Sequence, residues 1–180
     1  MHHFLSIVLS CALVIPVVSQ FATSLVTAET QTPIVAQSSD QVLPASAAIV
    51  TAPMILTNGV TSLAGGAQAE IANGGSAIFT FTITNAGEYV IEALVDAPAD
   101  NCNSFYANID SQPEGTDMTW DISITKGFEK RMLSWRGDGS PFTPEFAPKR
   151  FTLTPGTHKV IIVGRESEVL LKSLTIRPAP

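Results

Sequence analysis

The chain has 180 residues, of which 45% are hydrophobic and 14% charged, and its formal net charge is −6 at pH 7. This length suits one domain with flanking segments. An acidic chain is not expected to bind nucleic acid, which requires a basic face that displaces counterions. Residues 1–125 contain 11 acidic residues and no Lys or Arg, whereas residues 126–180 contain 10 basic and 5 acidic residues. The simpler interpretation is that the two halves interleave in one domain, and the alternative is head-to-tail association of subunits.

The N-terminus has the pattern of a cleaved signal peptide. Residues 4–18 (FLSIVLSCALVIPVV) are almost wholly apolar, and a stretch of small residues ends in Val26-Thr27-Ala28, which resembles an A-x-A cleavage site. The alternative is an uncleaved anchor, because residues 4–28 carry no charge and are long enough to span a bilayer; the Pro, Gln, Ser and Thr residues among them disfavour it. We therefore expect a signal peptide over residues 1–28, a secreted, periplasmic or cell-surface protein, and no membrane association after cleavage.

Residues 29–46 (ETQTPIVAQSSDQVLPAS) are rich in Thr, Gln, Ser and Pro, which predicts a flexible linker. Two apolar islands in it, Ile34-Val35 and Val42-Leu43, would alternatively dock as a loose strand or be donated to another subunit. Cys102 is the only cysteine after the predicted signal peptide, so we expect no disulfide framework. Its polar neighbours in residues 99–103 favour a partly exposed thiol.

From Ala47 onward the pattern is typical of β-strands. In residues 78–84, Phe79, Phe81 and Ile83 alternate with polar side chains. Residues 89–95 and 105–109 repeat this two-residue period, and turns such as Asn58-Gly59 separate the segments. No window shows a sustained 3.6-residue period. We therefore predict an all-β fold over residues 47–180, a jelly-roll β-sandwich of two antiparallel sheets.

Several segments together carry a family pattern. They are AGEYVI at residues 86–91, NSFYANID at residues 103–110, FTLTPGTHKVII at residues 151–162, Arg165-Glu166, and strands that contain Trp120 and Trp135. In this combination the chain resembles the galactose-binding-domain-like jelly-roll sandwiches, which include many bacterial carbohydrate-binding modules. The resemblance implies a non-catalytic module with a glycan or polysaccharide as its partner.

Calcium-binding members of that family place one carboxylate on the last strand and another on the first. The corresponding last-strand position here is Lys172, and residues 52–58 of the first strand contain no acid. Because calcium requires several oxygen ligands, we expect no metal and no other cofactor.

No catalytic constellation is evident in the sequence. His158 is the only histidine after the predicted signal peptide, and without a Cys or His partner it is expected to be structural. The acid pairs Asp96 with Asp100 and Asp117 with Asp121 are interpreted as solvated, because no partner residue completes a glycosidase-like site. We therefore expect that the protein is not an enzyme.

The candidate ligand-binding residues are Tyr106, Asn108, Asp110, Trp120 and Trp135. Tyr106 shares the polar face of its strand with Asn108 and Asp110, so its ring would stack on a sugar while its neighbours bind hydroxyl groups; equally, it would only cover the outer sheet. Trp120 and Trp135 are expected on the same face of their strands as apolar residues, which favours core positions. They join the site only if a β-bulge turns them to the other face. The alternative function is a cell-surface structural or interaction subunit without a sugar site, which binds a cell-surface protein or itself.

Overall fold

The computed structural model describes residues 40–65, 68–136 and 147–180. The predicted signal peptide and the Ile34-Val35 island lie outside the described residues. In the described part, twelve strands and three short 3-10 turns follow one another. The elements are β1 (Gln41–Pro44), η1 (Ala45–Ala47), β2 (Ile49–Thr51), β3 (Met54–Thr57), β4 (Val60–Leu63), η2 (Ile71–Asn73), β5 (Ser76–Ile83), β6 (Gly87–Asp96), β7 (Ser104–Ile109), η3 (Thr116–Met118), β8 (Thr119–Asp121), β9 (Glu129–Met132), β10 (Phe151–Leu153), β11 (Gly156–Gly164) and β12 (Leu170–Pro178).

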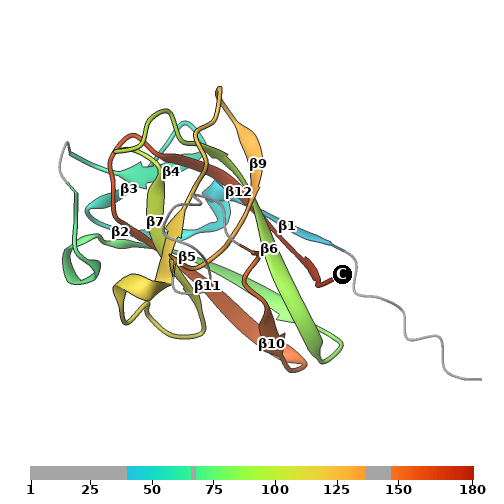
Figure 1. Ribbon diagram of the computed structural model, residues 1–180. Coiled ribbons are helices and arrows are strands. Elements are labelled where there is room, and N and C mark those ends of the chain that lie inside the picture. Colours follow the sequence, from blue (N-terminus) through green and yellow to red (C-terminus); the bar gives the residue numbers. More distant parts are fainter. Residues whose placement is uncertain (1–39, 66–67, 137–146) are drawn as a thin grey trace, which may run out of the picture. The chain divides into compact units, whose positions relative to one another are not determined.

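The strands form two sheets (Figure 1). The seven-stranded sheet has the order β10-β6-β12-β4-β3, with β1 added to β12 and β9 added to β6, and the five-stranded sheet has the order β2-β5-β11-β7-β8. Every pair of named strands is antiparallel. The predicted β-sandwich of two antiparallel sheets is therefore confirmed. None of the described residues form a helix long and apolar enough to cross a membrane.

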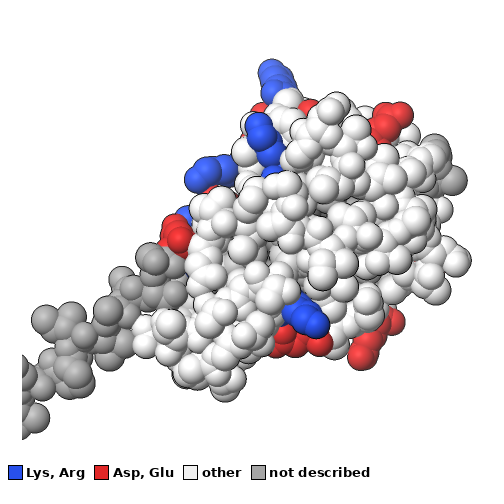
Figure 2. Space-filling view, turned by 180° about the vertical axis from the view of Figure 1, so that it is seen from behind, with Lys and Arg blue, Asp and Glu red and all other residues white. Residues whose placement is uncertain are grey.

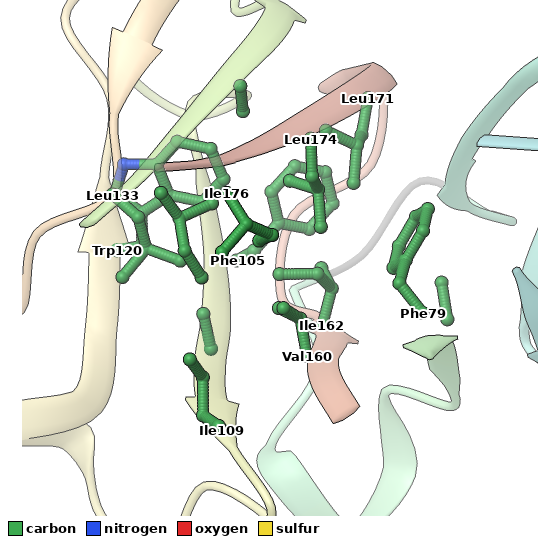
Figure 3. Packing of buried hydrophobic residues seen from close by; sticks show 14 of the residues in the cluster. Phe79, Phe105, Ile109, Trp120, Leu133, Val160, Ile162, Leu171, Leu174 and Ile176 are labelled. Carbon is green, nitrogen blue, oxygen red and sulfur yellow. The ribbon is translucent and has the colours of Figure 1, made fainter. Parts of the chain in front are cut away.

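The core lies between the two sheets and follows the predicted alternation (Figure 3). In β5, Phe79, Phe81 and Ile83 are at most 3% exposed, whereas Thr80 and Thr82 between them are exposed. Other strands contribute to the same cluster, β6 with Tyr89, Ile91, Ala93 and Val95, and β7, β8, β11 and β12 with Phe105, Ala107, Ile109, Trp120, Val160, Ile162, Leu171, Leu174 and Ile176. A two-residue period specifies the buried face of each strand, because a shift by one residue would expose the whole apolar set.

The predicted linker contains a strand at its C-terminal end. β1 pairs with β12 from Gln41 opposite Ile176 to Pro44 opposite Ser173. Leu43 packs against the core, whereas Val42 is 64% exposed. Of the alternatives for the Val42-Leu43 island, the structure shows docking as a strand, so the sandwich begins ahead of Ala47.

The acidic first half and the basic second half interleave. Glu92 on β6 binds Lys130 Nζ at 2.8 Å and Arg177 Nη2 at 3.1 Å, and Glu88 binds Arg150 Nη1 at 3.1 Å. The simpler interpretation of the charge distribution is thus confirmed for these pairs. On the face shown in Figure 2, charged side chains lie mostly toward the margins and leave a broad uncharged area between them.

Candidate functional site

A segment around η2 covers part of the outer face of the five-stranded sheet. Tyr106 on β7 packs there with Ile161 and Val163 of β11, and Ile71 of η2 lies against them. The Tyr106 hydroxyl donates to the Ala69 carbonyl at 3.5 Å, and the ring is only 3% exposed. The expectation that Tyr106 offers an open stacking surface is therefore corrected, because a segment distant in sequence lies on top of it.

Asn108 and Asp110 hold a chain reversal at the end of β7. Asn108 is 8% exposed, and its Nδ2 donates to Ser111 Oγ at 2.8 Å. Asp110 has a φ of 62°, and its two carboxylate oxygens accept from Lys159 N at 2.9 Å and contact His158 Nδ1 at 2.6 Å. These polar atoms make contacts within the protein that position the loop after β7, and the Asp110 side chain is 50% exposed. That Asn108 and Asp110 bind sugar hydroxyls stays a prediction.

The two tryptophans have different surroundings. Trp120 is fully buried beside Phe105, with 6.1 Å between ring centroids, and its Nε1 donates to Met132 O at 3.1 Å. Trp135 is half-buried; its Nε1 donates to Ala107 O at 2.8 Å, and the Lys149 ammonium lies 4.0 Å from its ring centroid. Trp120 is therefore a core residue, as its alternation with polar residues along the strand predicts. Because it is fully buried, the expectation that it stacks on a ligand is wrong. Trp135 already contacts a cation with one face of its ring.

A groove lies beside the η2 segment, and we call it the Asn73 groove. It has a volume of about 530 Å³, which is within the range of small-ligand sites. The lining residues are Thr51, Ala52, Pro53, Ile71, Ala72, Asn73, Gly75, Ser76 and Gln112. These lining residues carry hydroxyl, amide and aliphatic groups, and none of them is charged or aromatic. The groove is thus chemically suited to an uncharged ligand rich in hydrogen-bonding groups.

Two glycines allow the chain to enter the sheet at this groove. A Cβ at Gly74 would lie 1.9 Å from the Gly164 carbonyl oxygen, and a Cβ at Gly75, where φ is +64°, would lie 2.4 Å from the Thr51 carbonyl oxygen. Only glycine permits such close backbone approaches. In the sequence, Asn73-Gly74-Gly75 indicates a turn, and no periodic signal brings Gln112 to the same place.

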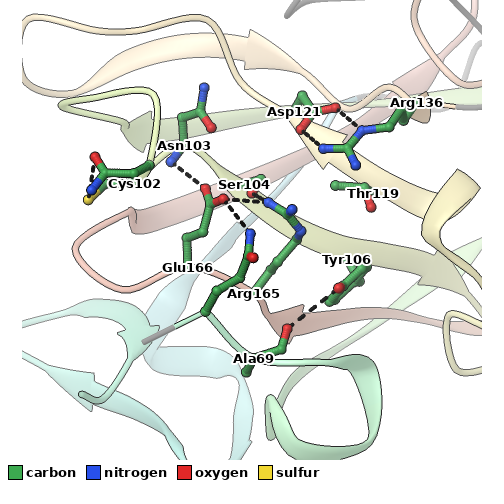
Figure 4. Close-up of polar contacts among 12 residues, drawn as sticks. Ala69, Cys102, Asn103, Ser104, Tyr106, Thr119, Asp121, Arg136, Arg165 and Glu166 are labelled. Atoms are coloured by element: carbon green, nitrogen blue, oxygen red, sulfur yellow. Dashed lines mark hydrogen bonds and ion pairs between the residues drawn. The ribbon is translucent and has the colours of Figure 1, made fainter. Parts of the chain in front are cut away.

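A buried polar network fixes the segment that leads into η2 (Figure 4). Glu166, which is 6% exposed, accepts from Asn103 N at 3.0 Å and from Gln68 Nε2 at 3.0 Å, and it pairs with Arg165. The Arg165 carbonyl accepts from Ala69 N at 2.7 Å. Since Glu166 joins three separate segments, this network positions the chain on which the Asn73 groove is built. The family pattern includes Arg165-Glu166, but no residue spacing in the sequence predicts the hydrogen-bond partners of Glu166.

A second ion pair lies beside this network. Arg136 Nε and Nη2 donate to the two carboxylate oxygens of Asp121 at 2.7 and 2.6 Å. The hydrogen bonds that Arg136 donates to Asp121 raise the pKa of Arg136 above its ordinary value, although partial burial opposes this. The pair ties the segment after β9 to the edge strand β8, so Asp121 is not the solvated acid that the sequence indicates.

Cys102 is buried, contrary to the expectation of a partly exposed thiol. It is 6% exposed, and its Sγ lies 3.7 Å from both Asn101 Oδ1 and Glu168 Oε2. Burial, followed by the charge and hydrogen bond of Glu168, raises the pKa of the thiol. A buried thiol with a raised pKa reacts slowly, so an intermolecular disulfide at Cys102 is disfavoured.

Lys172 occupies the last-strand position that the family resemblance aligns with a calcium ligand. Its ammonium lies 5.2 Å from the Phe128 ring centroid, and a lysine side chain offers no oxygen ligand. In the part of the chain that the structure describes, no three His, Cys, Asp or Glu side chains are grouped as a metal site. That folding needs no calcium stays a prediction.

Comparisons with known proteins support the fold. No protein-family model and no curated protein matches the sequence. Several solved structures match the structure of this chain, which has the β-sandwich fold of carbohydrate-binding modules.

One match is a family 35 carbohydrate-binding module from Clostridium thermocellum, with a TM-score of 0.54 at 10% identity over 79% of this chain and 100% of the module. The carbohydrate-binding module of Cellvibrio mixtus lichenase 5A, solved in complex with cellotriose, matches with a TM-score of 0.51 at 14% identity over 78% of this chain and 98% of that one. A GH26-CBM35 β-(1,4)-mannanase of Podospora anserina matches with a TM-score of 0.54 at 12% identity over 78% of this chain. This chain spans only 28% of the length of the mannanase.

Proposed function

We propose that the protein is an exported, non-catalytic module that binds an uncharged glycan in the Asn73 groove. The observation that carries this proposal is the groove's lining, which combines neutral hydrogen-bonding side chains with small aliphatic surfaces. The fold supports it, because two solved structures that match over nearly their full length are carbohydrate-binding modules.

The lining groups suit sugar hydroxyls. Asn73 and Gln112 each present an amide that both donates and accepts, while Thr51 and Ser76 present hydroxyl groups. Pro53 and Ile71 supply apolar surface for the C–H faces of a sugar ring. Each hydrogen bond replaces one to water, and the described lining includes no aromatic ring, so we expect weak affinity, on the order of micromolar to millimolar.

Replacing Asn73 and Gln112 by Ala should weaken glycan binding. Each substitution removes one side chain's hydrogen bonds and should lower the affinity by about 2- to 10-fold, with a larger loss in the double variant. Calorimetric titration with cellotriose and affinity electrophoresis in mannan gels measure this effect. The matched control is Asn101→Ala, which removes an exposed amide outside the groove lining and should leave the affinity unchanged.

The control and the double variant together decide the proposal. Unchanged affinity in Asn73→Ala/Gln112→Ala would place the glycan elsewhere. A parent protein that binds neither glycan and forms oligomers would favour the alternative function, an interaction subunit.

One feature specifically favours that alternative. β2 and β3 lie at the open edges of the two sheets. Their side chains Ile49, Ile55 and Leu56 are 70%, 41% and 41% exposed, and residues 47–57 contain no charge. Uncharged, apolar edges are suited to pairing with a strand of another chain.

Export is the other part of the proposal. The apolar run in residues 4–18 and the Val26-Thr27-Ala28 sequence support cleavage after Ala28. Intact-mass measurement of protein from the culture medium or periplasm should give an N-terminus at or near Glu29. Full-length protein retained in the membrane would contradict export.

A further inference from the structure

His158 on β11 is held between two hydrogen-bond acceptors. Its Nδ1 lies 2.6 Å from Asp110 Oδ2, and its Nε2 lies 2.8 Å from the Thr154 carbonyl oxygen. A neutral imidazole has a single N–H group, whereas the imidazolium has two. Both contacts are therefore satisfied only when His158 carries a positive charge.

Among the described residues, the contacts of the ring give it one charged partner, Asp110. From β5 the ring meets Phe81, whose centroid is 5.6 Å away, and from the turn before β11 it meets the Thr154 carbonyl. Neither of these groups titrates. Next to it on β11, Lys159 contributes its backbone N–H, which donates to Asp110 Oδ1 at 2.9 Å. Burial opposes the charged ring, but the hydrogen bonds to Asp110 and Thr154 and the charge of Asp110 outweigh it, so the pKa of His158 is raised above 6.5.

Asp110 is the first residue of the loop that reaches the Asn73 groove. Its backbone N–H donates to Lys159 O at 2.9 Å, and its carboxylate binds both His158 and Lys159 N. The next residue, Ser111, accepts from Asn108 Nδ2, and the residue after that, Gln112, lines the groove. The position of Gln112 thus depends on an anchor two residues earlier.

We propose that Asp110 and protonated His158 are positioning residues that clamp this loop, so that glycan affinity of the Asn73 groove falls as rising pH removes the His158 charge. The proposal rests on the proposed function of the groove. On deprotonation, the ring donates to only one of its two acceptors and no longer attracts the Asp110 carboxylate by charge. The loop then loses part of its anchor, and Gln112 is less well held for the ligand.

The experiment measures the clamp and the ligand separately in the full chain. NMR titration from pH 5.5 to 9 follows the His158 ring, and hydrogen exchange of the Asp110 and Lys159 amides, corrected for intrinsic exchange, follows the loop. Calorimetry with cellotriose follows the groove. We expect His158 to titrate above 6.5, amide protection to fall over the same range, and affinity to fall by about 2- to 10-fold, the equivalent of one hydrogen bond.

Two variants provide the controls. His158→Gln retains a donor without a charge that titrates, and Asp110→Asn retains a residue that tolerates positive φ without the carboxylate. Both should abolish the pH dependence of amide protection and of affinity. Assignment of the ring signal comes from its absence in His158→Gln.

The outcomes separate the two proposals. If neither cellotriose nor mannan binds but loop protection follows His158, the proposed function fails and the clamp stands. If His158 titrates below 6.5, or if affinity stays constant while His158 titrates, the clamp is overturned. The same pH dependence in His158→Gln would also overturn it.

Discussion

The Phe105→Ala variant should lose about 3–5 kcal/mol of the free energy of unfolding, the cost typical of a large buried aromatic side chain. Phe105 is fully buried on the core face of β7, and its ring centroid lies 6.1 Å from that of Trp120. Removing the ring leaves a cavity between the two sheets. The neighbouring strands cannot move to fill it, because backbone hydrogen bonds hold them in place. Urea unfolding followed by tryptophan fluorescence measures the loss.

Phe128→Ala is the matched control for this prediction. Phe128 is 38% exposed in the loop between β8 and β9. Its ring contacts the Lys172 ammonium, a surface interaction with a typical value of about 0.5–1 kcal/mol. We expect Phe128→Ala to lose less than about 1 kcal/mol. Equal losses in the two variants would show that the Phe105 ring is not a core element.

The sequence predicts the sandwich well because its signal is local. Phe79, Phe81 and Ile83 alternate with threonines, and the side chains of an extended strand must point to opposite faces. The same alternation correctly places Phe105 between the sheets and indicates a core position for Trp120. Each of these assignments needs only neighbours within one strand.

The candidate site is less predictable because it depends on contacts between distant segments. The alternation of polar and apolar residues correctly places Tyr106 on the outer face of β7. It cannot show that Ala69, 37 residues earlier, accepts a hydrogen bond from the Tyr106 hydroxyl or that Ile71 packs against this residue. Cys102 stands in a polar sequence but is buried, and one of its contacts is with Glu168, from the loop after β11. Residues such as Gln112 reach the groove through loop geometry, for which a single sequence has no periodic signal.

The charge distribution is only partly predictable from the sequence. A sequence with its acids in the first half and its bases in the second predicts pairing between the halves but not the partners. Glu92 has two cations on different strands, Lys130 of β9 and Arg177 of β12. Only the strand order, in which β9 and β12 lie on either side of β6, determines that choice.

The Arg165→Met variant should be strongly destabilised, by about 3–5 kcal/mol, because it breaks a buried ion pair by removing one partner. The side chains of Arg165 and Glu166 are 15% and 8% exposed, and the guanidinium also donates to Ser104 Oγ. Without Arg165, the Glu166 carboxylate keeps the donors Asn103 N and Gln68 Nε2 but loses the cation that offsets its desolvation. Urea unfolding of the variant and the parent at pH 7 measures the difference.

Two comparisons make the Arg165 prediction specific. Arg150→Met removes a guanidinium from an exposed pair, in which Arg150 and Glu88 are 47% and 54% exposed, and should cost at most about 1 kcal/mol. The double variant Arg165→Met/Glu166→Leu removes both charges and should recover part of the loss, since two apolar side chains leave no unpaired carboxylate. If Arg165→Met is no more destabilising than Arg150→Met, Glu166 is solvated in solution, and the network does not hold the segment at Ala69 that leads into the Asn73 groove.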